Sequence, residues 1–224
     1  MSDAVTVRVN GEATRRVGPD RATVRLTVEG RGAAAGSAVA DLRSATAPVD
    51  AALGRHHASI TAREASRVTA RPNVWRDART GEERRDGYVA TRTTSVEVAP
   101  AAAVASLIDD VTATVPDVAI DGPWWTVDPD NPVHAEVRAE AAADARSRAE
   151  AYARGLGVGV GAAVRIAEPG LGGWGAGPAG QPGEMVRAMM GDYVGQGHDG
   201  AALIDVGEEQ VEVSAHVEVE FRLT

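Results

Sequence analysis

Apolar and polar residues alternate over several stretches of the chain, which is the pattern of strands with one buried face. The alternation is clearest over residues 211–223, where every second position from Val211 to Phe221 is apolar. Such runs are typical of antiparallel sheets that expose one face. Seven strands are expected in all, at residues 5–9, 22–28, 60–71, 88–98, 118–127, 158–167 and 211–223.

Glycine and proline mark where these strands are expected to turn. Asn10-Gly11 predicts a turn after the first strand, and the first two strands could pair across residues 11–19. Residues 71–87 (RPNVWRDARTGEERRDG) are polar and interrupted by glycine. They are interpreted as the extended tip of a long hairpin formed by the third and fourth strands.

Three segments between the strands have helical spacing of apolar residues. The expected helices are residues 33–55, which Pro48 kinks or divides; residues 100–115, which begin at Pro100; and a third that follows residue 132 and ends at Gly155 or Gly157.

In the third helix, small and apolar residues recur at steps of three and four along one face. This stripe consists of Ala142, Ala145, Ala149, Tyr152 and Leu156. A stripe this narrow predicts a helix that lies very close to a sheet. On the other faces, Asp144 with Arg148 and Arg146 with Glu150 stand four residues apart and are expected to form ion pairs.

Strands that come singly or in pairs, separated by three helices, predict an α+β protein with mostly antiparallel sheet and the helices packed on it. The length fits a single domain over residues 1–224. Residues 168–207 are rich in Gly and Pro and are expected to be a mobile loop or insertion within that domain.

Charge and composition narrow the function classes. The formal net charge of −9 disfavours nucleic acid as a partner. All 23 basic residues are arginine, which excludes Schiff-base and P-loop lysines. The absence of cysteine excludes disulfides and thiolate ligands. No stretch is apolar enough for a membrane span and no signal-peptide pattern begins the chain, so a cytoplasmic location is expected.

No set of residues converges on a catalytic, metal or cofactor site, so no cofactor is expected. The histidines lack the spacing of metal ligands; they are His56, His57, His134, His198 and His216. Residues 170–177 contain the G-x-G-x-x-G spacing, but Pro178 and Pro182 stand where a nucleotide-binding helix should run.

Large apolar side chains are the candidates for binding. Trp124 and Trp125 are adjacent on an expected strand, so they face opposite sides, one toward the core and one exposed or at an interface. Residues 185–190 (MVRAMM) could cover the core as a lid or contact a neighbouring subunit. The candidate partner or ligand contacts are Trp124, Trp125, Trp174, Met185 and Met189.

Four segments, taken in order, resemble the SIMPL family. They read VTVRVNGEATRRVGPDRATVRLTVEG, GYVATRTTSVEV, AEAAADARSRAEAYARGLGVGVGAAVRIAEPG and VSAHVEVEFRL, and together they run from about residue 5 to residue 223. The resemblance implies an α+β fold. Some members assemble into large rings, and bacterial members are linked to oxidative-stress tolerance and the cell envelope. Many carry an export signal, from which this sequence departs, and no catalytic residues are agreed for the family.

The leading hypothesis is therefore a non-enzymatic protein that acts through self-association or a protein partner, with the link to stress tolerance that the resemblance implies. The alternative is a small-molecule-binding protein or enzyme in which residues 168–200 form a lid over a sheet face.

Overall fold

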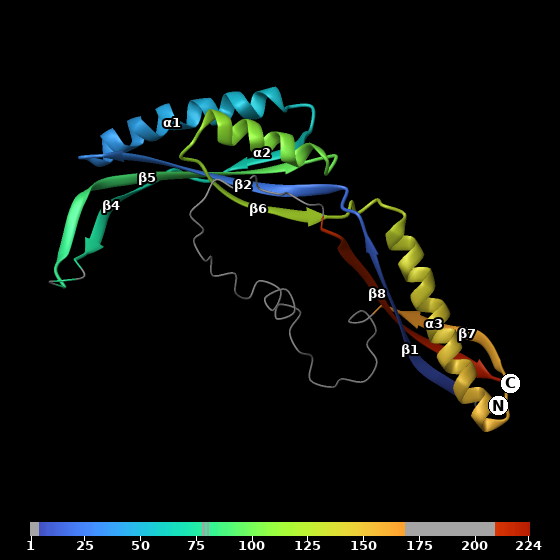
Figure 1. The fold of residues 1–224 in the computed structure, drawn as a ribbon. Helices are drawn as coiled ribbons and strands as arrows, with labels where there is room; N and C mark the ends of the chain where they lie inside the picture. Colours follow the sequence, from blue (N-terminus) through green and yellow to red (C-terminus); the bar gives the residue numbers. More distant parts are fainter. Residues whose placement is uncertain (1–4, 78, 80, 169–208) are drawn as a thin grey trace. The chain divides into compact units, whose positions relative to one another are not determined.

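The computed structural model describes residues 5–77, 79, 81–168 and 209–224 (Figure 1). The described helices are separated by single strands or runs of strands, and the pairings given for the strands are antiparallel, so the α+β class is confirmed. The described helices are α1 (Ala35–Arg55), α2 (Ala103–Thr114) and α3 (Val133–Leu156). The described strands are β1 (Thr6–Val17), β2 (Arg21–Gly32), β3 (Ile60–Ala65), β4 (Thr69–Arg76), β5 (Glu83–Val98), β6 (Ala119–Thr126), β7 (Val160–Ala167) and β8 (Val211–Leu223).

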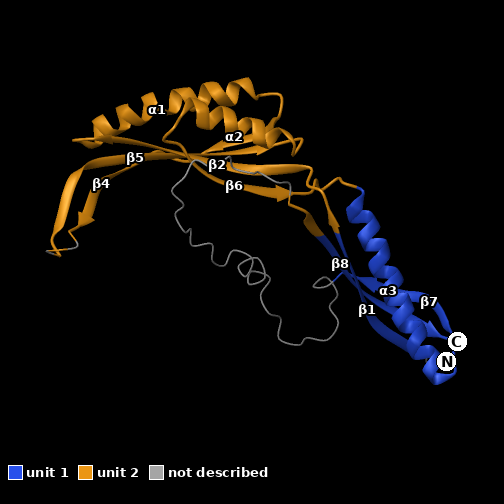
Figure 2. Cartoon of the chain, in the orientation of Figure 1, with its two compact units in different colours: residues 1–15, 132–205, 213–224 blue, residues 16–131, 206–212 orange. Residues whose placement is uncertain are grey.

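The chain divides into two compact units (Figure 2). Unit 1 comprises residues 1–15, 132–205 and 213–224, and unit 2 comprises residues 16–131 and 206–212. The single domain expected over residues 1–224 stays a prediction. The Gly/Pro-rich segment 168–207 lies outside the described residues, apart from Glu168.

Unit 2 is a sheet with the strand order β3-β5-β2-β6, to which β4 adds by pairing with β5. Helices α1 and α2 cover one face of it (Figure 1). The core between the two layers is aliphatic, and Leu26, Leu53 and Leu107 are among its fully buried side chains. The close packing depends on Gly30 of β2, because a Cβ added there would lie 2.1 Å from the backbone nitrogen of Leu42 in α1.

The hairpin of unit 2 has more strand than its sequence predicts. Residues 60–71 form two strands, β3 and β4, which both pair with β5, so the described part of the chain has eight strands where seven were expected. Within the expected tip, residues 71–76 and 83–87 belong to β4 and β5, and the Asp77 amide donates a hydrogen bond to the Glu82 carbonyl. Few of these residues are buried, so no apolar alternation marks them in the sequence.

Two proline positions bear on the expected helices. Pro48 lies inside α1, which is a single helix, so the division into two parts is wrong, whereas the kink given as the alternative stays a prediction. Pro100 precedes α2, which begins at Ala103, and the carbonyl of Pro100 accepts a hydrogen bond from the Ala103 amide. The apolar face expected for this helix is confirmed, since its buried residues are Val104, Leu107, Ile108 and Val111.

Unit 1 is a sheet with the strand order β1-β8-β7, and α3 packs on one face of it. The turn expected at Asn10-Gly11 is wrong, because β1 continues through it, and β1 and β2 lie in different sheets and do not pair. Gly11 instead lets α3 approach the strand. A Cβ added at Gly11 would lie 2.0 Å from the carbonyl oxygen of Ala141 and 2.8 Å from the Cβ of Ala145.

The close helix–sheet packing expected for α3 is confirmed, but the buried stripe is shifted. The buried residues step by four and are Val133, Val137, Ala141, Ala145, Ala149 and Ala153. Tyr152 and Leu156 are instead exposed, with relative accessibilities of 64% and 70%. Contact along an i, i+4 ridge explains the shift, because this row is inclined to the helix axis. Both expected ion pairs form: Arg148 lies 2.9 Å from Asp144, and Arg146 lies 3.0 Å from Glu150.

Candidate binding surfaces

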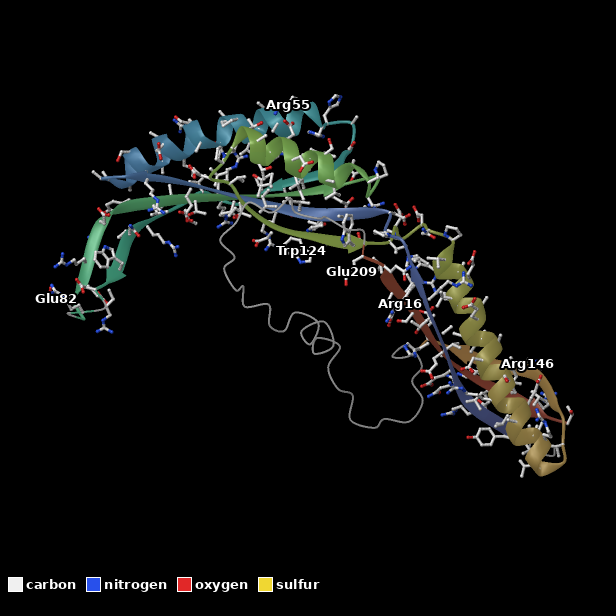
Figure 3. All side chains as sticks on the ribbon, viewed as in Figure 1. Arg16, Arg55, Glu82, Trp124, Arg146 and Glu209 are labelled. Carbon is white, nitrogen blue, oxygen red and sulfur yellow. The ribbon has the colours of Figure 1, made fainter. Side chains whose placement is uncertain are left out.

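The two adjacent tryptophans of β6 face opposite sides of the unit 2 sheet, as the strand period requires. Trp125 packs against the core beneath the helices. Trp124 is 44% exposed and projects from the other face, away from α1 and α2 (Figure 3). The guanidinium of Arg25 lies 4.9 Å from the centroid of the Trp124 ring, within the range of a cation–π contact. The indole is thereby held in place while part of it stays accessible.

Directly paired residues project to the same face of a sheet. The strand register therefore groups the side chains of this face into two rows, most of them polar, and Trp124 belongs to the first row. The first row, from β6 to β3, is Trp124, Thr23, Glu97 and Ala62. The second row is Asp121, Arg25, Ser95 and Glu64. We refer to these two rows as the helix-free face.

A depression of about 280 Å³ lies in this face. Its lining consists of Thr23, Ala62, Arg63, Glu64, Ser95 and Glu97, five of which carry polar or charged groups. Among the described residues, the side chains of Thr23, Glu64 and Ser95 have no hydrogen-bond or ion-pair partner. Three polar groups are thus free to contact a molecule bound beside Trp124.

Glu97 is held as a carboxylate at the edge of the same depression. The hydroxyl of Thr61 donates a hydrogen bond to it (2.7 Å), and Arg21 pairs with it at 2.7 Å. The Thr61 hydrogen bond and the charge of Arg21 lower the pKa of Glu97. Arg21 also pairs with Asp128, so the charges at this end of the face are neutralised internally.

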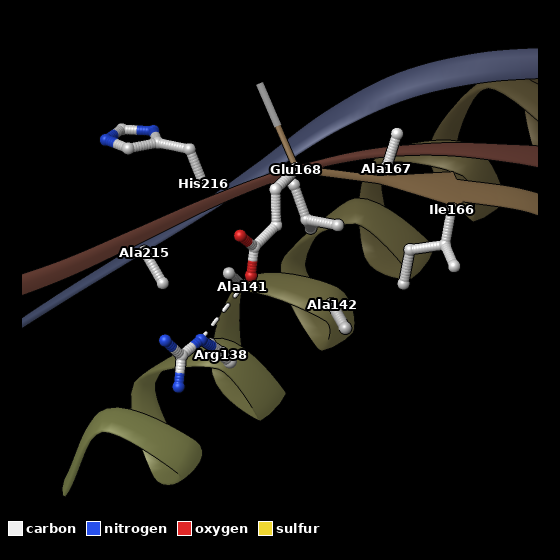
Figure 4. A pocket seen from close by; sticks show the side chains of 9 residues that line it. Arg138, Ala141, Ala142, Ile166, Ala167, Glu168, Ala215 and His216 are labelled. Carbon is white, nitrogen blue, oxygen red and sulfur yellow. Dashed lines mark ion pairs between the residues drawn. The ribbon is translucent and has the colours of Figure 1, made fainter. Parts of the chain in front are cut away.

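A second candidate surface is apolar and belongs to unit 1. A depression of about 330 Å³ lies between α3, the end of β7 and β8 (Figure 4). Small and aliphatic side chains form most of its lining, among them Ala141, Ala142, Ile166, Ala215 and Val217. The lining also includes His216 and the ion pair between Arg138 and Glu168 (3.5 Å). Ile166 is 63% exposed, so β7 offers an aliphatic surface next to this depression.

A charged contact joins β1 to α3 on unit 1. Arg148 of α3 pairs with Glu12 of β1 and with Asp144, each at 2.9 Å. The backbone N–H of Glu12 donates to Asp144 (3.0 Å), and this bond, together with Arg148, lowers the pKa of Asp144. His216 lies 4.0 Å from Glu12 and is exposed, as its polar position on the last strand predicts. These groups fasten the helix to the strand.

Asp110 of α2 takes part in a structural contact. Asp110 pairs with Arg55 (2.8 Å) and contacts His56 (3.1 Å), which joins α2 to the end of α1. The Arg55 hydrogen bonds and, to a smaller extent, His56 lower the pKa of Asp110. Asp110 therefore links two helices.

Within residues 5–77, 79, 81–168 and 209–224, no three His, Asp or Glu side chains converge on a possible metal position. None of the described helices is both long and apolar enough to cross a membrane. The expectation of a cytoplasmic location stays a prediction.

Of the five candidate contacts proposed from the sequence, the structure places two. Trp124 is on the helix-free face, and Trp125 is partly buried and packs against the core of unit 2. Trp174, Met185 and Met189 lie outside the described residues, as does the expected lid after residue 168.

The helix-free face and the apolar surface near β7 were not predicted from the sequence. One sequence pattern indicates the helix-free face. Thr23 of β2 and Thr93 and Ser95 of β5 stand at positions whose side chains project to the same face of the sheet.

The comparison with protein families agrees with the segment resemblance. The family model described as SIMPL, a protein of unknown function (DUF541), matches residues 7–221. No curated protein matches the chain.

Proposed function

We propose that this chain, which belongs to the SIMPL family, is a non-enzymatic protein that works by associating with a second copy of itself through unit 1. One observation carries the proposal, namely the concentration of exposed apolar side chains on this unit. Of the ten large apolar residues with high exposure in the described part of the chain, six lie in unit 1: Val5, Tyr152, Leu156, Val158, Val164 and Ile166.

The strand β7 is the part of this surface best suited to a partner. It lies at one edge of the described sheet, so its outer backbone groups have no strand beside them among the described residues. Arg165 is its single charged residue. Edge strands of monomeric proteins are commonly protected by several charges or by a covering element. An edge with one charge and an exposed Ile166 favours a protein partner.

A second copy is the partner that the geometry favours. A two-fold axis brings the same patch of both subunits together, so an apolar patch becomes its own complement. The apolar depression beside Ile166 offers space for a side chain of the other copy. Stable interfaces bury roughly 1,200–2,000 Å² in total. The surface around β7 would therefore form the centre of the contact, with neighbouring polar residues at its rim.

The described ionisable groups support a non-enzymatic role. Catalytic acids and bases usually have pKa values shifted toward neutrality. Here the shifts run away from neutrality, and in each case a hydrogen bond is the largest cause. The pKa is lowered for Glu97, Asp110 and Asp144 and raised for Arg15, Arg55 and Arg148. These groups are held in their charged forms, as in structural ion pairs.

Sedimentation velocity over a range of protein concentrations tests the proposal. The wild-type chain is expected to self-associate, and Ile166→Glu is expected to weaken the association by about tenfold or more, since it places a charge in the centre of an apolar contact. The matched control is Val74→Glu, on β4 of unit 2, where the replaced side chain is also exposed (49%). It should associate like the wild type.

A wild-type chain that stays monomeric at every concentration would refute the proposal. So would an Ile166→Glu variant that associates as tightly as the wild type. Circular dichroism spectra of both variants show whether the fold is kept.

The family resemblance adds a link to tolerance of oxidative stress, which we include in the proposal. A host strain that lacks the chain should regain peroxide tolerance with the wild-type or Val74→Glu gene, and less with Ile166→Glu. Equal rescue by all three would separate stress tolerance from self-association.

A further inference from the structure

We infer that the helix-free face of unit 2 is a binding site for a neutral oligosaccharide. The inference does not depend on self-association, because all of its residues lie in unit 2 and the proposed contact between copies lies in unit 1.

Trp124 supplies the stacking surface that a sugar ring requires. The faces of a pyranose ring carry C–H groups that pack on an indole, while its edges carry hydroxyls. Trp124 is 44% exposed, and Arg25 over its ring fixes its orientation. An indole that is already held in place loses little side-chain freedom when a ligand stacks on it.

The polar rows beside Trp124 supply hydrogen bonds at the right place. Neighbouring strands are about 4.8 Å apart, so the row from Trp124 on β6 to Glu97 on β5 spans about 10 Å. Thr23 lies between them, and Ser95 and Glu64 belong to the adjacent row. A hydroxyl both donates and accepts. The unpartnered side chains of Thr23, Ser95 and Glu64 can therefore each bond to a sugar hydroxyl.

The charges of the face favour a neutral ligand. Glu97 is already paired with Arg21, and Arg25 is engaged with the Trp124 ring. Two more carboxylates, those of Glu64 and Asp121, belong to the second row. A nucleic acid could also stack a base on Trp124, but its phosphates would meet these carboxylates and the net charge of −9. A neutral sugar chain stacks without that repulsion.

The test has two stages, both on the full chain. An array of neutral and acidic glycans identifies ligands. Isothermal titration with the soluble form of each bound glycan then measures affinity, because arrays amplify the binding of multivalent proteins. Cellohexaose, maltohexaose and chitohexaose are titrated in any case as neutral probes, and a heparin hexasaccharide as an acidic one.

At least one neutral glycan is expected to bind. Trp124→Ala should weaken its binding by about tenfold or more, as is common when a stacking aromatic is removed. Ser95→Ala and Glu64→Ala should each weaken it by a smaller factor. Trp75→Ala is the matched control, because Trp75 is equally exposed (47%) but lies on β4, and it should bind like the wild type.

Three results would overturn the inference: no neutral glycan binds, only acidic glycans bind, or Trp124→Ala binds as well as Trp75→Ala does. Ile166→Glu should keep the full affinity for the glycan. A variant that loses glycan binding but still self-associates contradicts nothing in the proposed function. A variant that loses self-association but still binds the glycan likewise leaves this inference intact, so the two can fail separately.

Discussion

Substitution of Gly11 by alanine tests the central packing contact of unit 1. The strand β1 passes beneath α3 at this residue with no space for a side chain. A Cβ at Gly11 would lie 2.0 Å from the carbonyl oxygen of Ala141, 2.6 Å from the backbone nitrogen of Ala145 and 2.8 Å from its Cβ. Two of these atoms belong to the helix backbone and cannot move aside as the end of a flexible side chain would.

The size of the effect follows from two opposing contributions. Overpacking a core costs about 1–3 kcal/mol, and a collision with backbone belongs at the upper end of that range. Replacing glycine by alanine also restricts the unfolded chain, which stabilises by about 0.4–1 kcal/mol. We therefore expect Gly11→Ala to lower the free energy of unfolding of unit 1 by about 2 kcal/mol.

Hydrogen exchange measured by mass spectrometry is the appropriate assay, because two units can unfold separately and a single melting curve then mixes them. Amides of α3 and β8 should exchange faster in Gly11→Ala, while those of α1 and β2 should be unchanged. The control is Gly155→Ala on α3, where a Cβ would meet no atom within 4 Å. It should stabilise the helix by about 0.5–1 kcal/mol.

The reasoning would be refuted if Gly11→Ala left exchange in α3 at the wild-type rate. It would also be refuted if the variant slowed exchange as Gly155→Ala is expected to, because the close approach at Gly11 would then not limit packing.

Three further predictions concern the same contacts. Gly30→Ala places a Cβ 2.1 Å from the Leu42 amide nitrogen, so it should speed exchange in α1 and leave α3 unchanged; the reverse pattern would contradict it. Ala145→Leu should destabilise unit 1 by ~1–3 kcal/mol through overpacking. An unchanged exchange rate in α3 would argue against the buried position of Ala145. The folded-state pKa of Asp144 is lowered, first by the Glu12 amide and then by Arg148, so its contribution to stability is present above the unfolded pKa of about 3.9 and lost as the pH falls through the folded value. Asp144→Asn should therefore reduce the difference between about pH 6 and about pH 3 in the urea concentration at which unit 1 unfolds, followed by exchange of the α3 amides, and an undiminished difference would contradict this.

The strands with one buried face are the part of the fold that the sequence predicts well. β2 and β8 bury alternate residues against helices, so their apolar residues recur at the period that the sequence analysis detects. β4 and the start of β5 have few buried residues, so pairing there leaves no trace in the apolar pattern. Their strand character comes from backbone hydrogen bonds to each other, which a single sequence does not display.

The error at Gly11 has a different cause. An Asn-Gly pair is a strong local turn signal, because both residues tolerate the left-handed backbone conformation. Here the glycine is needed for its missing side chain, since a helix that is distant in the sequence lies against it. The residues next to a glycine do not show whether it forms a turn or lies beneath a distant helix. The candidate surfaces could not be predicted for the same reason, because they depend on residues that are distant in the sequence. The helix-free face is assembled from four strands, and only the register brings Trp124, Thr23 and Glu97 into one row.

Both units solve the same packing problem in the same way. In each, a strand passes beneath an alanine-rich helix at a glycine: Gly11 under Ala141 and Ala145 of α3, and Gly30 under Ala38 and Leu42 of α1. With only 4% aromatic residues, the chain has few large side chains to fill a wide gap between layers, so close approach of the backbones fills it instead. The exposed Trp124 has no part in this packing, and neither does Ile166. Large side chains that the core does not use, in a chain that has so few of them, are the residues on which binding is best tested first.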